Sequence, residues 1–591
     1  MARNTYDVDE QLESPFDLGH FKRAMVYIVK HKWPMIGALL LSAISSVSAL
    51  ATPMITQHAI DKSIPNKDIP QLLMLSGLML LAIIVSVLLS NKRQRIMTRV
   101  GQDIIYDIRK DLFNHLQKLP FEYYDSRPQG KILIRVVNYV NSVSDMLSNG
   151  LINFILEIFN MIFIVIFMFA MSYKLSLVVL AGLPIFIIVM FAIKTFQRRA
   201  WQAVSNKSSN LNAYTAESIG GVRITQLFNR QEENDGIFQR LCKAYRKAWM
   251  RAVKLSNLVF VTVENIQTWV TASIYVIGLL VIGPSGATLG TILAMGGYAG
   301  RFWQPILNLS NIYNNVINNM AYLERIFETI DEPVTVDDVE GAYELPEVVG
   351  NLSFADVTFR YDESKNILEN LSIDVKAGES IALVGPTGAG KTTVVNLISR
   401  FYNINSGAIL LDGHDISKVT LTSLRSQMGI MLQDSFIFSG TIIDNIRYGK
   451  LDATEEEVIA ACKTVCADEF IQELEDGYYT EVNENGGGLS QGQKQLISFA
   501  RTLLANPRVL ILDEATSSID AKTERLLQKG LNELLKGRTS FIIAHRLSTI
   551  KNCDRIMYVN NKGITESGSH AVLMAKHGDY YNLYTAQRLD A

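Results

Sequence analysis

Six long apolar stretches are the feature that most limits how this chain can fold. They lie near 33–56, 70–90, 148–171, 175–195, 256–280 and 287–311. A helix needs about 20 apolar residues to cross the hydrocarbon core of a bilayer. The stretch 70–90 carries no charge, whereas a buried helix of that length in a soluble protein normally keeps a polar face. We therefore expect six transmembrane helices in the first half of the chain.

The basic residues between these stretches predict which side of the membrane each connection occupies. The connections 91–147 and 196–255 are rich in lysine and arginine, whereas 57–69 has only two lysines and 281–286 has no basic residue. The segment before the first stretch carries Lys22, Arg23, Lys30 and Lys32. Positively charged connections stay in the cytoplasm. We expect both termini and both long connections there, with the long connections forming helical extensions and 16–32 an amphipathic surface helix.

A few polar and aromatic residues fall inside the apolar stretches. They include the charged residues Glu157, Glu264 and Arg301 and the aromatic residues Trp269 and Trp303. A charge in lipid is costly and usually faces a protein interior or a water-filled path. One interpretation is a substrate cavity for amphipathic or cationic molecules, which these five residues contact. The other is that they only join helices, for example through a pair between Arg301 and a glutamate.

A glycine-rich loop dominates the second half. The apolar strand Ile381–Val384 runs into Gly385-x-x-x-x-Gly390-Lys391-Thr392, and an apolar-periodic helix follows. Glycines let backbone N–H groups close around phosphate oxygens, the lysine reaches the β- and γ-phosphates, and the threonine holds Mg²⁺. The helix N-terminus adds a favourable dipole. We expect ATP and Mg²⁺ to bind, with contacts from Gly385, Pro386, Thr387, Gly388, Ala389, Gly390, Lys391, Thr392 and Thr393.

A second element supplies carboxylates to the same chemistry. Val509–Leu512 reads as a buried strand that ends in Asp513 and Glu514. Asp513 suits a Mg²⁺ role, often through water. Glu514, one residue further, is expected to face the attacking water as general base. The sequence thus predicts an ATP hydrolase.

Composition argues against two other classes of site. The net charge of −2 lacks the strongly basic balance typical of nucleic-acid binding, so we expect no nucleic-acid partner. The four cysteines do not form a zinc set, and none lies in a connection expected outside the cell. A reduced cytoplasmic setting fits them.

A short motif between the two nucleotide elements gives the chain a family resemblance. Leu489-Ser490-Gln491-Gly492-Gln493 resembles the signature motif of ATP-binding cassette (ABC) proteins. The resemblance implies ATP contacts from Ser490, Gly492 and Gln493. It also implies an adenine-stacking role for Tyr361, a Mg²⁺ and catalytic role for Gln433, a D-loop at 517–520 and a catalytic switch at His545. Together with Thr392 and Asp513, Gln433 completes the expected metal set.

The resemblance extends over nearly the whole chain. Six spans with two long inner connections look like an ABC exporter half; 121–143 and 212–234 resemble its coupling regions, and 324–333 resembles the link between its two parts. The implied fold is an α-helical six-span transmembrane domain followed by an α/β phosphate-loop nucleotide-binding domain. The expected divisions are 1–32 for the tail and surface helix, 33–325 for the transmembrane domain, 326–348 for a linker and 349–591 for the nucleotide-binding domain.

One departure from the family pattern suggests the kind of partner. Gln491 replaces the usual signature glycine, and 483–486 differs from the usual segment before it, whereas Lys391, Glu514 and His545 match. This mixture resembles one half of bacterial heterodimeric multidrug exporters, in which one ATP site is weakened. We expect a second half-transporter as partner, a heterodimer rather than a homodimer, in the bacterial plasma membrane.

The function expected from these features is ATP-driven export. The chain would move amphipathic or drug-like small molecules out of the cytoplasm or inner leaflet, using ATP held between two chains. A lipid flippase of the same fold is the first alternative. A soluble ABC ATPase without a transport function is the second, and the six apolar stretches argue against it.

Overall fold

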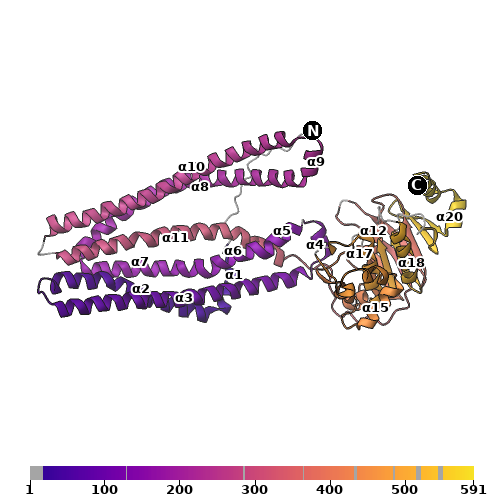
Figure 1. Cartoon of the computed structure of the whole chain (residues 1–591), viewed down its shortest axis with the longest axis horizontal. Coiled ribbons are helices and arrows are strands. Elements are labelled where there is room, and N and C mark those ends of the chain that lie inside the picture. Colours follow the sequence, from indigo (N-terminus) through magenta and orange to yellow (C-terminus); the bar gives the residue numbers. More distant parts are fainter. Residues whose placement is uncertain are drawn as a thin grey trace. The chain divides into compact units, whose positions relative to one another are not determined.

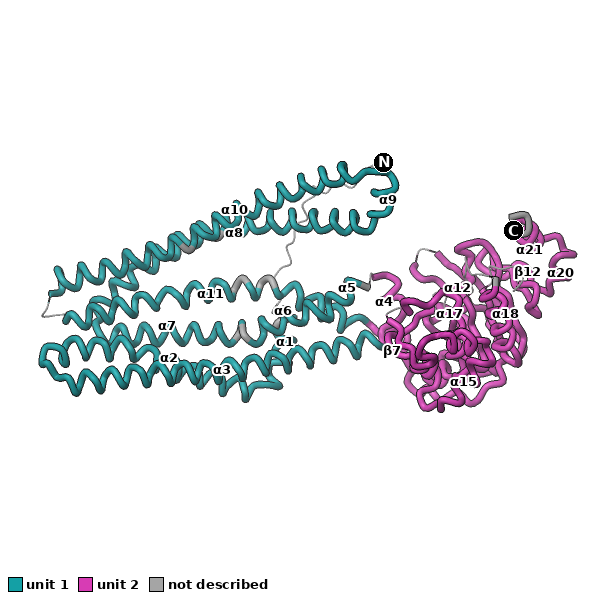
Figure 2. Tube along the Cα trace, viewed as in Figure 1, with its two compact units in different colours: residues 1–117, 129–332 teal, residues 118–128, 333–591 magenta. Residues whose placement is uncertain are grey.

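The fold consists of two compact units that we describe separately. The computed structural model describes residues 18–127, 129–283, 287–363, 365–431, 435–483, 486–513, 521–543 and 550–590. The first unit comprises the chain up to residue 117 together with 129–332, and the second comprises 118–128 and the chain from 333 onward (Figure 2).

The described part of the first unit is entirely helical (Figure 1). Its α-helices are α1 (Leu18–Lys30), α2 (Lys32–His58), α3 (Ile69–Leu116), α5 (Gln129–Ile134), α6 (Val140–Asp145), α7 (Leu151–Met171), α8 (Tyr173–Gly220), α9 (Val222–Leu227), α10 (Gln231–Val276) and α11 (Leu289–Ile330). Short π-helical turns join some of them: η1 (Ala59–Ser63), η2 (Arg135–Tyr139), η3 (Met146–Gly150) and η4 (Ile277–Ile282).

Long apolar helices confirm the prediction of membrane spans. Five helical segments in the described chain are long and apolar enough to cross a bilayer: Lys32–Ser63, Ile69–Leu116, Ile132–Met171, Tyr173–Gly220 and Gln231–Ile282. The sixth expected span lies on α11, whose apolar run is interrupted by polar residues such as Arg301 and Gln304. On α3, Leu73, Met74 and Leu88 are 62–75% exposed. Such an apolar surface suits contact with lipid rather than water.

Three of the helices continue well beyond the length of a span. α3 and α8 each have 48 residues, and α10 has 46. At about 1.5 Å per residue each extends roughly 70 Å, more than twice the hydrocarbon thickness. The prediction that the long connections extend the spans as helices is therefore confirmed.

The membrane helices pack around one apolar core. α2, α7, α8, α10 and α11 contribute to it, with Trp303, Phe302 and Tyr298 among its largest buried side chains. Gly182 on α8 permits a close approach, because a Cβ there would come within 2.6 Å of Val270 Cγ2. α8 and α10 run side by side and diverge from the other helices towards α9, which joins them (Figure 1).

The second unit is built on two larger sheets and one antiparallel pair of short strands. Its strands are β1 (Leu352–Phe359), β2 (Leu368–Val375), β3 (Ser380–Val384), β4 (Ser406–Leu411), β5 (His414–Asp415), β6 (Met428–Met431), β7 (Gly440–Thr441), β8 (Glu481–Val482), β9 (Val509–Asp513), β10 (Thr539–Ile543), β11 (Arg555–Asn560) and β12 (Gly563–Gly568). One sheet has the order β2-β1-β4-β5 and is antiparallel; the other has the order β12-β11-β3-β10-β9-β6 and is parallel except for β12.

Helices cover the larger sheet and complete two apolar cores. They are α4 (Phe121–Asp125), α12 (Lys391–Ile398), α13 (Leu421–Ser426), α14 (Ile442–Arg447), α15 (Glu455–Thr464), α16 (Asp468–Gln472), η5 (Gly477–Tyr479), α17 (Gln491–Ala505), α18 (Ala521–Leu535), α20 (His570–Lys576) and α21 (Asp579–Asp590). One core contains buried residues of α15, α17 and α18. The other contains buried residues of α12 and the smaller sheet. Strands such as β9 are buried on both faces, which accounts for their unbroken apolar sequence.

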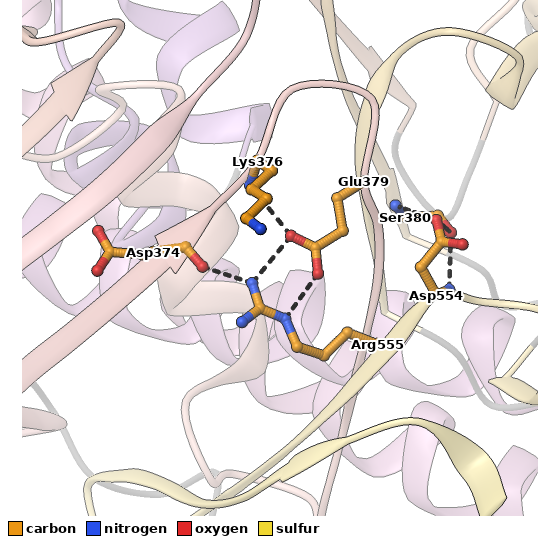
Figure 3. A network of polar contacts seen from close by, with 6 residues as sticks. All are labelled: Asp374, Lys376, Glu379, Ser380, Asp554 and Arg555. Carbon is orange, nitrogen blue, oxygen red and sulfur yellow. Dashed lines mark hydrogen bonds and ion pairs between the residues drawn. The ribbon is translucent and has the colours of Figure 1, made fainter.

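A polar network joins the two sheets at the start of β3 (Figure 3). The Arg555 guanidinium forms an ion pair with Glu379, with 2.9 Å between Nε and Oε1, and donates to the backbone carbonyl of Asp374. Asp554 accepts from both the amide and the hydroxyl of Ser380. The network fixes the turn between β2 and β3, so the strand that leads into the glycine-rich loop starts from a defined position.

The units divide the chain differently from the expected domains in two places. α11 continues to Ile330, past the expected domain end at 325, because Phe327 is buried there and Arg23 stacks on its ring at 4.3 Å. Residues 118–128, expected in the transmembrane domain, belong to the second unit. They join it because the Phe121 and Phe401 rings lie 4.3 Å apart and Tyr402 donates a 2.6 Å hydrogen bond to Asp125.

Candidate nucleotide site and membrane residues

The glycine-rich loop leaves β3 and enters α12 in the predicted way. Gly385 has a φ of +144°, and a Cβ there would lie 2.2 Å from the carbonyl oxygen of Val559. Gly390 caps α12 with a φ of +104°, in the left-handed region that favours glycine. These two positions let the backbone turn tightly against its neighbours, and the N-terminus of α12 then faces the loop.

Lys391 is held inside the loop. Its side chain is 8% exposed, and Nζ donates to the carbonyl oxygens of Gly385 and Pro386 at 2.8 and 3.0 Å. Burial lowers the pKa of the lysine, and the charge of Asp513 partly opposes that shift. A cation that is desolvated in this way is poised to gain from a polyphosphate, so the loop fits the triphosphate of ATP.

The sheet register brings the second element to the same edge. β10 pairs with both β3 and β9, and Ile543 aligns with Leu383 on one side and with Asp513 on the other. The carboxyl ends of these three parallel strands therefore meet at one edge, where α/β sheets bind ligands. Asp513 and the exposed Thr392 suit the expected Mg²⁺ ligands in both chemistry and strand position.

An aromatic cluster stands beside the loop. The Tyr361 hydroxyl lies 3.1 Å from Thr393 Oγ1, and its ring packs edge-on against Phe359 and Tyr402 at 4.8 and 5.0 Å. Tyr361 is 42% exposed, which leaves part of its ring open to stack on a base. Burial, together with the bond to Asp125, raises the pKa of Tyr402 above its usual range, so that hydroxyl stays protonated.

The signature segment begins a helix. Ser490 caps α17 by accepting from the Gln493 amide, and the Gln493 side chain accepts from the Ser490 amide at 2.8 Å. This reciprocal arrangement is a capping box. Gly492 is buried, whereas Ser490 and Gln491 are exposed. The serine hydroxyl and the start of α17 thus face outward from this chain.

Three expected catalytic residues and one predicted loop lie outside the described residues. They are Gln433, Glu514, His545 and the segment 517–520. Asp513 directly precedes Glu514 in sequence, Ile543 stands two residues before His545, and both end described strands of the larger sheet.

The five predicted membrane residues divide among different surroundings. Trp303 is 1% exposed and packs on Phe186 in the apolar core, whereas Trp269 is 73% exposed and Glu264 is also exposed, both on α10. Arg301 donates to the backbone oxygen of Ala49 at 2.7 Å. The structure does not gather the five into one cluster.

Glu157 belongs to a group of polar side chains that joins α7 and α11. Its Oε1 accepts from Asn308 of α11 at 2.7 Å, and its Oε2 accepts from Asn160 at 3.5 Å. Sequence reasoning missed Asn308. The signal was present, because Gln304, Asn308, Asn311 and Asn315 recur every three or four residues, which places amides on one face of a helix.

Two family models match the chain. The model described as ABC transporter transmembrane region matches residues 35–306, and the model described as ABC transporter matches residues 368–517. The first match lies within the helical unit; the second covers the glycine-rich loop, the signature segment and Asp513.

Curated relatives align over most of the chain. A putative multidrug export ATP-binding/permease protein of Bacillus subtilis, YgaD, is 35% identical over 587 residues, covering 97% of this chain and 100% of the relative. A fatty acid ABC transporter ATP-binding/permease protein of Mycobacterium bovis is 38% identical over 492 residues, covering 83% of this chain and 78% of the relative.

A solved structure has the same arrangement of elements. It is a bacterial Atm1-family ABC exporter with ATP bound, and it is similar to this chain with a TM-score of 0.77 and 28% identity, over 97% of this chain and 99% of the other. Apolar helices that continue beyond the membrane, a phosphate loop at a sheet edge and a capped signature helix thus occur together in one polypeptide that matches its relatives almost end to end, and the chain belongs to the ABC transporters as an exporter half-transporter.

Proposed function

We propose that this chain is one half of an ATP-driven exporter that moves amphipathic or drug-like molecules out of the cytoplasm or the inner leaflet. The observation that carries the proposal is the position of residues 118–128. They pack within the nucleotide-binding unit but are continuous in sequence with α3 and α5 of the helical unit. A movement of the nucleotide-binding unit therefore pulls directly on membrane helices.

In this proposal the nucleotide is held by the glycine-rich loop, the aromatic cluster beside it and the residues that follow the neighbouring strands. Lys391 and the backbone of the loop receive the phosphates, Tyr361 supports the base, and Thr392 and Asp513 hold Mg²⁺ with Gln433. The metal supplies charge neutralisation during phosphoryl transfer. Glu514 takes the proton of the attacking water, and His545 contacts the γ-phosphate side of the site.

Two exposed features support a second chain as partner. Ser490 and the start of α17 face outward, which suits an ATP molecule held between this signature segment and another chain's phosphate loop. At the junction of α8, α9 and α10, Ile219, Ile224, Leu227 and Phe228 are 61–73% exposed. Apolar patches on cytoplasmic segments usually mark interfaces. We infer that a nucleotide-binding domain of the second chain covers them.

The altered signature favours two different chains over two copies. Gln491 is the first residue of α17, and its exposed side chain stands where the family pattern has glycine. We propose that this side chain weakens the ATP site formed with the partner's phosphate loop. The site that contains Lys391 and Glu514 would be completed by the partner's signature and would remain competent. In the same proposal, both termini and the nucleotide-binding unit lie on the cytoplasmic side of a bacterial plasma membrane.

The relatives favour two classes of substrate. The multidrug relative supports drug-like amphiphiles, which is the proposal made above. The fatty acid transporter, which shares 38% identity, supports a lipid or fatty-acid substrate as the second candidate. Stimulation of ATP hydrolysis by drug-like cations, compared with stimulation by lipids and fatty acids, separates the two.

The test is reconstitution of the chain in lipid vesicles, alone and with a candidate second half-transporter. We expect ATP hydrolysis and substrate movement only from the assembled pair. Full hydrolysis by an isolated monomer would contradict the two-chain ATP site. Equal hydrolysis at both sites of a homodimer would contradict the heterodimer proposal while leaving export intact.

A further inference from the structure

A row of basic side chains follows one face of α10. Successive members are three or four residues apart, which keeps them on the same side of a helix, and all are exposed: Arg240, Lys243, Lys247, Arg251 and Lys254. α8 runs beside α10 along this stretch (Figure 1). No aspartate or glutamate occurs in 236–263 of α10 or in 173–216 of α8. The two paired helices therefore offer the row no carboxylate of their own.

The same face of α10 becomes apolar where the helix enters the expected span 256–280. Leu258 and Val261 follow Lys254 at four and seven residues, so they continue the row on the same face. Their side chains are 49% and 50% exposed. Exposed apolar side chains on a membrane span suit contact with acyl chains. The face is thus basic just outside the span and apolar just inside it.

Two tryptophans lie at the level where this change occurs. Trp201 of α8 donates to Ser256 Oγ at 3.1 Å, and its ring meets that of Trp249 edge-on at 5.4 Å. The two side chains are 38% and 40% exposed. Tryptophan is enriched where the hydrocarbon of a bilayer meets its polar head groups. Arg251 and Lys254 stand between Trp249 and Ser256 in the sequence, so we place them at this boundary.

The length of the row separates two kinds of anion. A water-soluble polyanion is free to contact the whole row, from Arg240 onward. The phosphate of a phospholipid is tied to its acyl chains and reaches only the end of the row beside the span. Basic clusters next to the end of a membrane helix attract acidic lipids, and arginine pairs with phosphate through two parallel hydrogen bonds. The apolar continuation at Leu258 and Val261 favours the lipid.

We propose that Arg251 and Lys254 bind the phosphate of an anionic phospholipid whose acyl chains lie along Leu258 and Val261. Lys247, one helical turn further from the span, reaches the same head group with its long side chain. The lipid is a bound component of the transporter in its membrane, so the inference stands whichever substrate is exported.

Two lipids with identical acyl chains test the site in the assembled transporter. Dioleoylphosphatidylglycerol carries a net negative charge and dioleoylphosphatidylcholine carries none. Native mass spectrometry from dodecyl maltoside, a neutral detergent, counts each bound lipid, and the readout is the ratio of the two apparent dissociation constants. We expect the wild type to prefer phosphatidylglycerol. The double variant Arg251→Gln with Lys254→Gln should lower the preference about tenfold or more, since each basic residue beside an anionic head group contributes about fivefold.

A matched pair of substitutions controls for net charge. Arg240→Gln with Lys243→Gln removes two charges from the same face, roughly 16 Å further along the helix, which exceeds the Debye length of about 8 Å at physiological salt. This control should keep the wild-type preference. Arg251→Lys with Lys254→Arg keeps both charges and should also keep it. An equal loss in the control pair, or a wild type without preference, would overturn the site.

Two further measurements test the lipid assignment itself. Inorganic phosphate, which lacks acyl chains, should not displace phosphatidylglycerol at comparable concentrations, and displacement would mean that the row binds phosphate alone. Leu258→Gln should weaken both lipids and leave their ratio unchanged, because it alters only the acyl-chain contact. Unchanged binding of both lipids in this variant would contradict the placement of the chains. None of these readouts uses ATP hydrolysis, so they are independent of the proposed export function.

Discussion

The phosphate loop and the polar cavity between α6, α7 and α11 are two regions of opposite construction. The loop is one continuous segment, 385–393, and its pattern is expected to bind a ligand, ATP, that many proteins share. The cavity draws Ser142 and Asn153 from two successive helices, α6 and α7, and Asn319 from α11, more than 150 residues later. A segment that binds a shared ligand leaves a sequence motif, whereas a cavity between helices is assembled by packing.

The two regions also differ in the charge of their central side chain. Lys391 is a buried cation whose Nζ donates to two carbonyls of its own loop, and burial lowers its pKa. Glu157 is a carboxylate bonded to amides. The phosphate loop therefore holds a buried cation with Asp513 nearby, whereas the membrane helices hold a carboxylate between amides.

The largest expected effect comes from removing the base at the nucleotide site. Glu514→Gln should lower ATP hydrolysis at least 100-fold and leave nucleotide binding largely intact, because only the proton acceptor is lost. Phosphate release and binding of a fluorescent ATP analogue measure the two quantities. Glu533→Gln, a change of a partly exposed residue on α18 that pairs with Lys536, serves as the matched control. Near-normal hydrolysis in Glu514→Gln would remove this residue from its proposed role.

The next effect separates binding from folding at the same site. Lys391→Met removes a charged contact to phosphate and should weaken ATP binding about 10- to 100-fold. It should not lower the thermal stability of the ATP-free protein, because the native site already disfavours the charged lysine. Calorimetric binding and thermal unfolding check both parts. A large loss of stability without ATP would show that Lys391 supports the fold rather than the ligand.

A smaller effect tests the connection between the two regions. Phe121→Ala removes the ring that packs on Phe401, in the segment that links α3 to α5. We expect substrate movement per ATP to fall several-fold while hydrolysis continues. Tyr402→Phe, which deletes only the hydroxyl bound to Asp125, should give a weaker loss in the same direction. Parallel loss of hydrolysis and transport in both variants would mean that the segment supports the nucleotide site instead of coupling.

The smallest effect concerns the charge pair that joins α1 to the end of α11. Arg23 bonds Asp331 through both guanidinium nitrogens and lowers the pKa of that carboxyl, so the pair stabilises the fold above the ordinary aspartate pKa near 3.8. This stability is lost as the pH falls through the lowered value. Both side chains are about half exposed, so we expect at most about 0.5 kcal/mol. Protease cleavage near α1 at pH 7 and pH 3.5, in the wild type and Asp331→Asn, measures it; the variant should show no pH-dependent difference from this pair.

Sequence alone predicted the elements that depend on local pattern. The apolar runs gave the spans, and the strand–loop–helix order around Lys391 gave the nucleotide fold. The helical extensions followed from apolar spacing in the long connections. The family resemblance marked 121–143 as a coupling region, but the packing of 118–128 within the second unit was not predictable from local pattern. It depends on Phe401 and Tyr402, more than 270 residues later.

The membrane residues show the same limit more sharply. Glu157 and Arg301 were both visible as charges in apolar stretches, but their partners decide what they do. The partner of Glu157 is an amide 151 positions away, and that of Arg301 is a backbone carbonyl 252 positions away. A backbone acceptor carries no side-chain signature, so no pattern in the sequence points to it.

That backbone acceptor exists because of one proline. A helix carbonyl normally accepts from the amide four residues later, and for Ala49 that residue is Pro53, which has no N–H. The orphaned oxygen accepts a hydrogen bond from Arg301 and so anchors the only charge of the last expected span to the first. Pro53 in α2 thereby determines where the Arg301 guanidinium of α11 lies, and this cation is not bonded to the Glu157 carboxylate of α7.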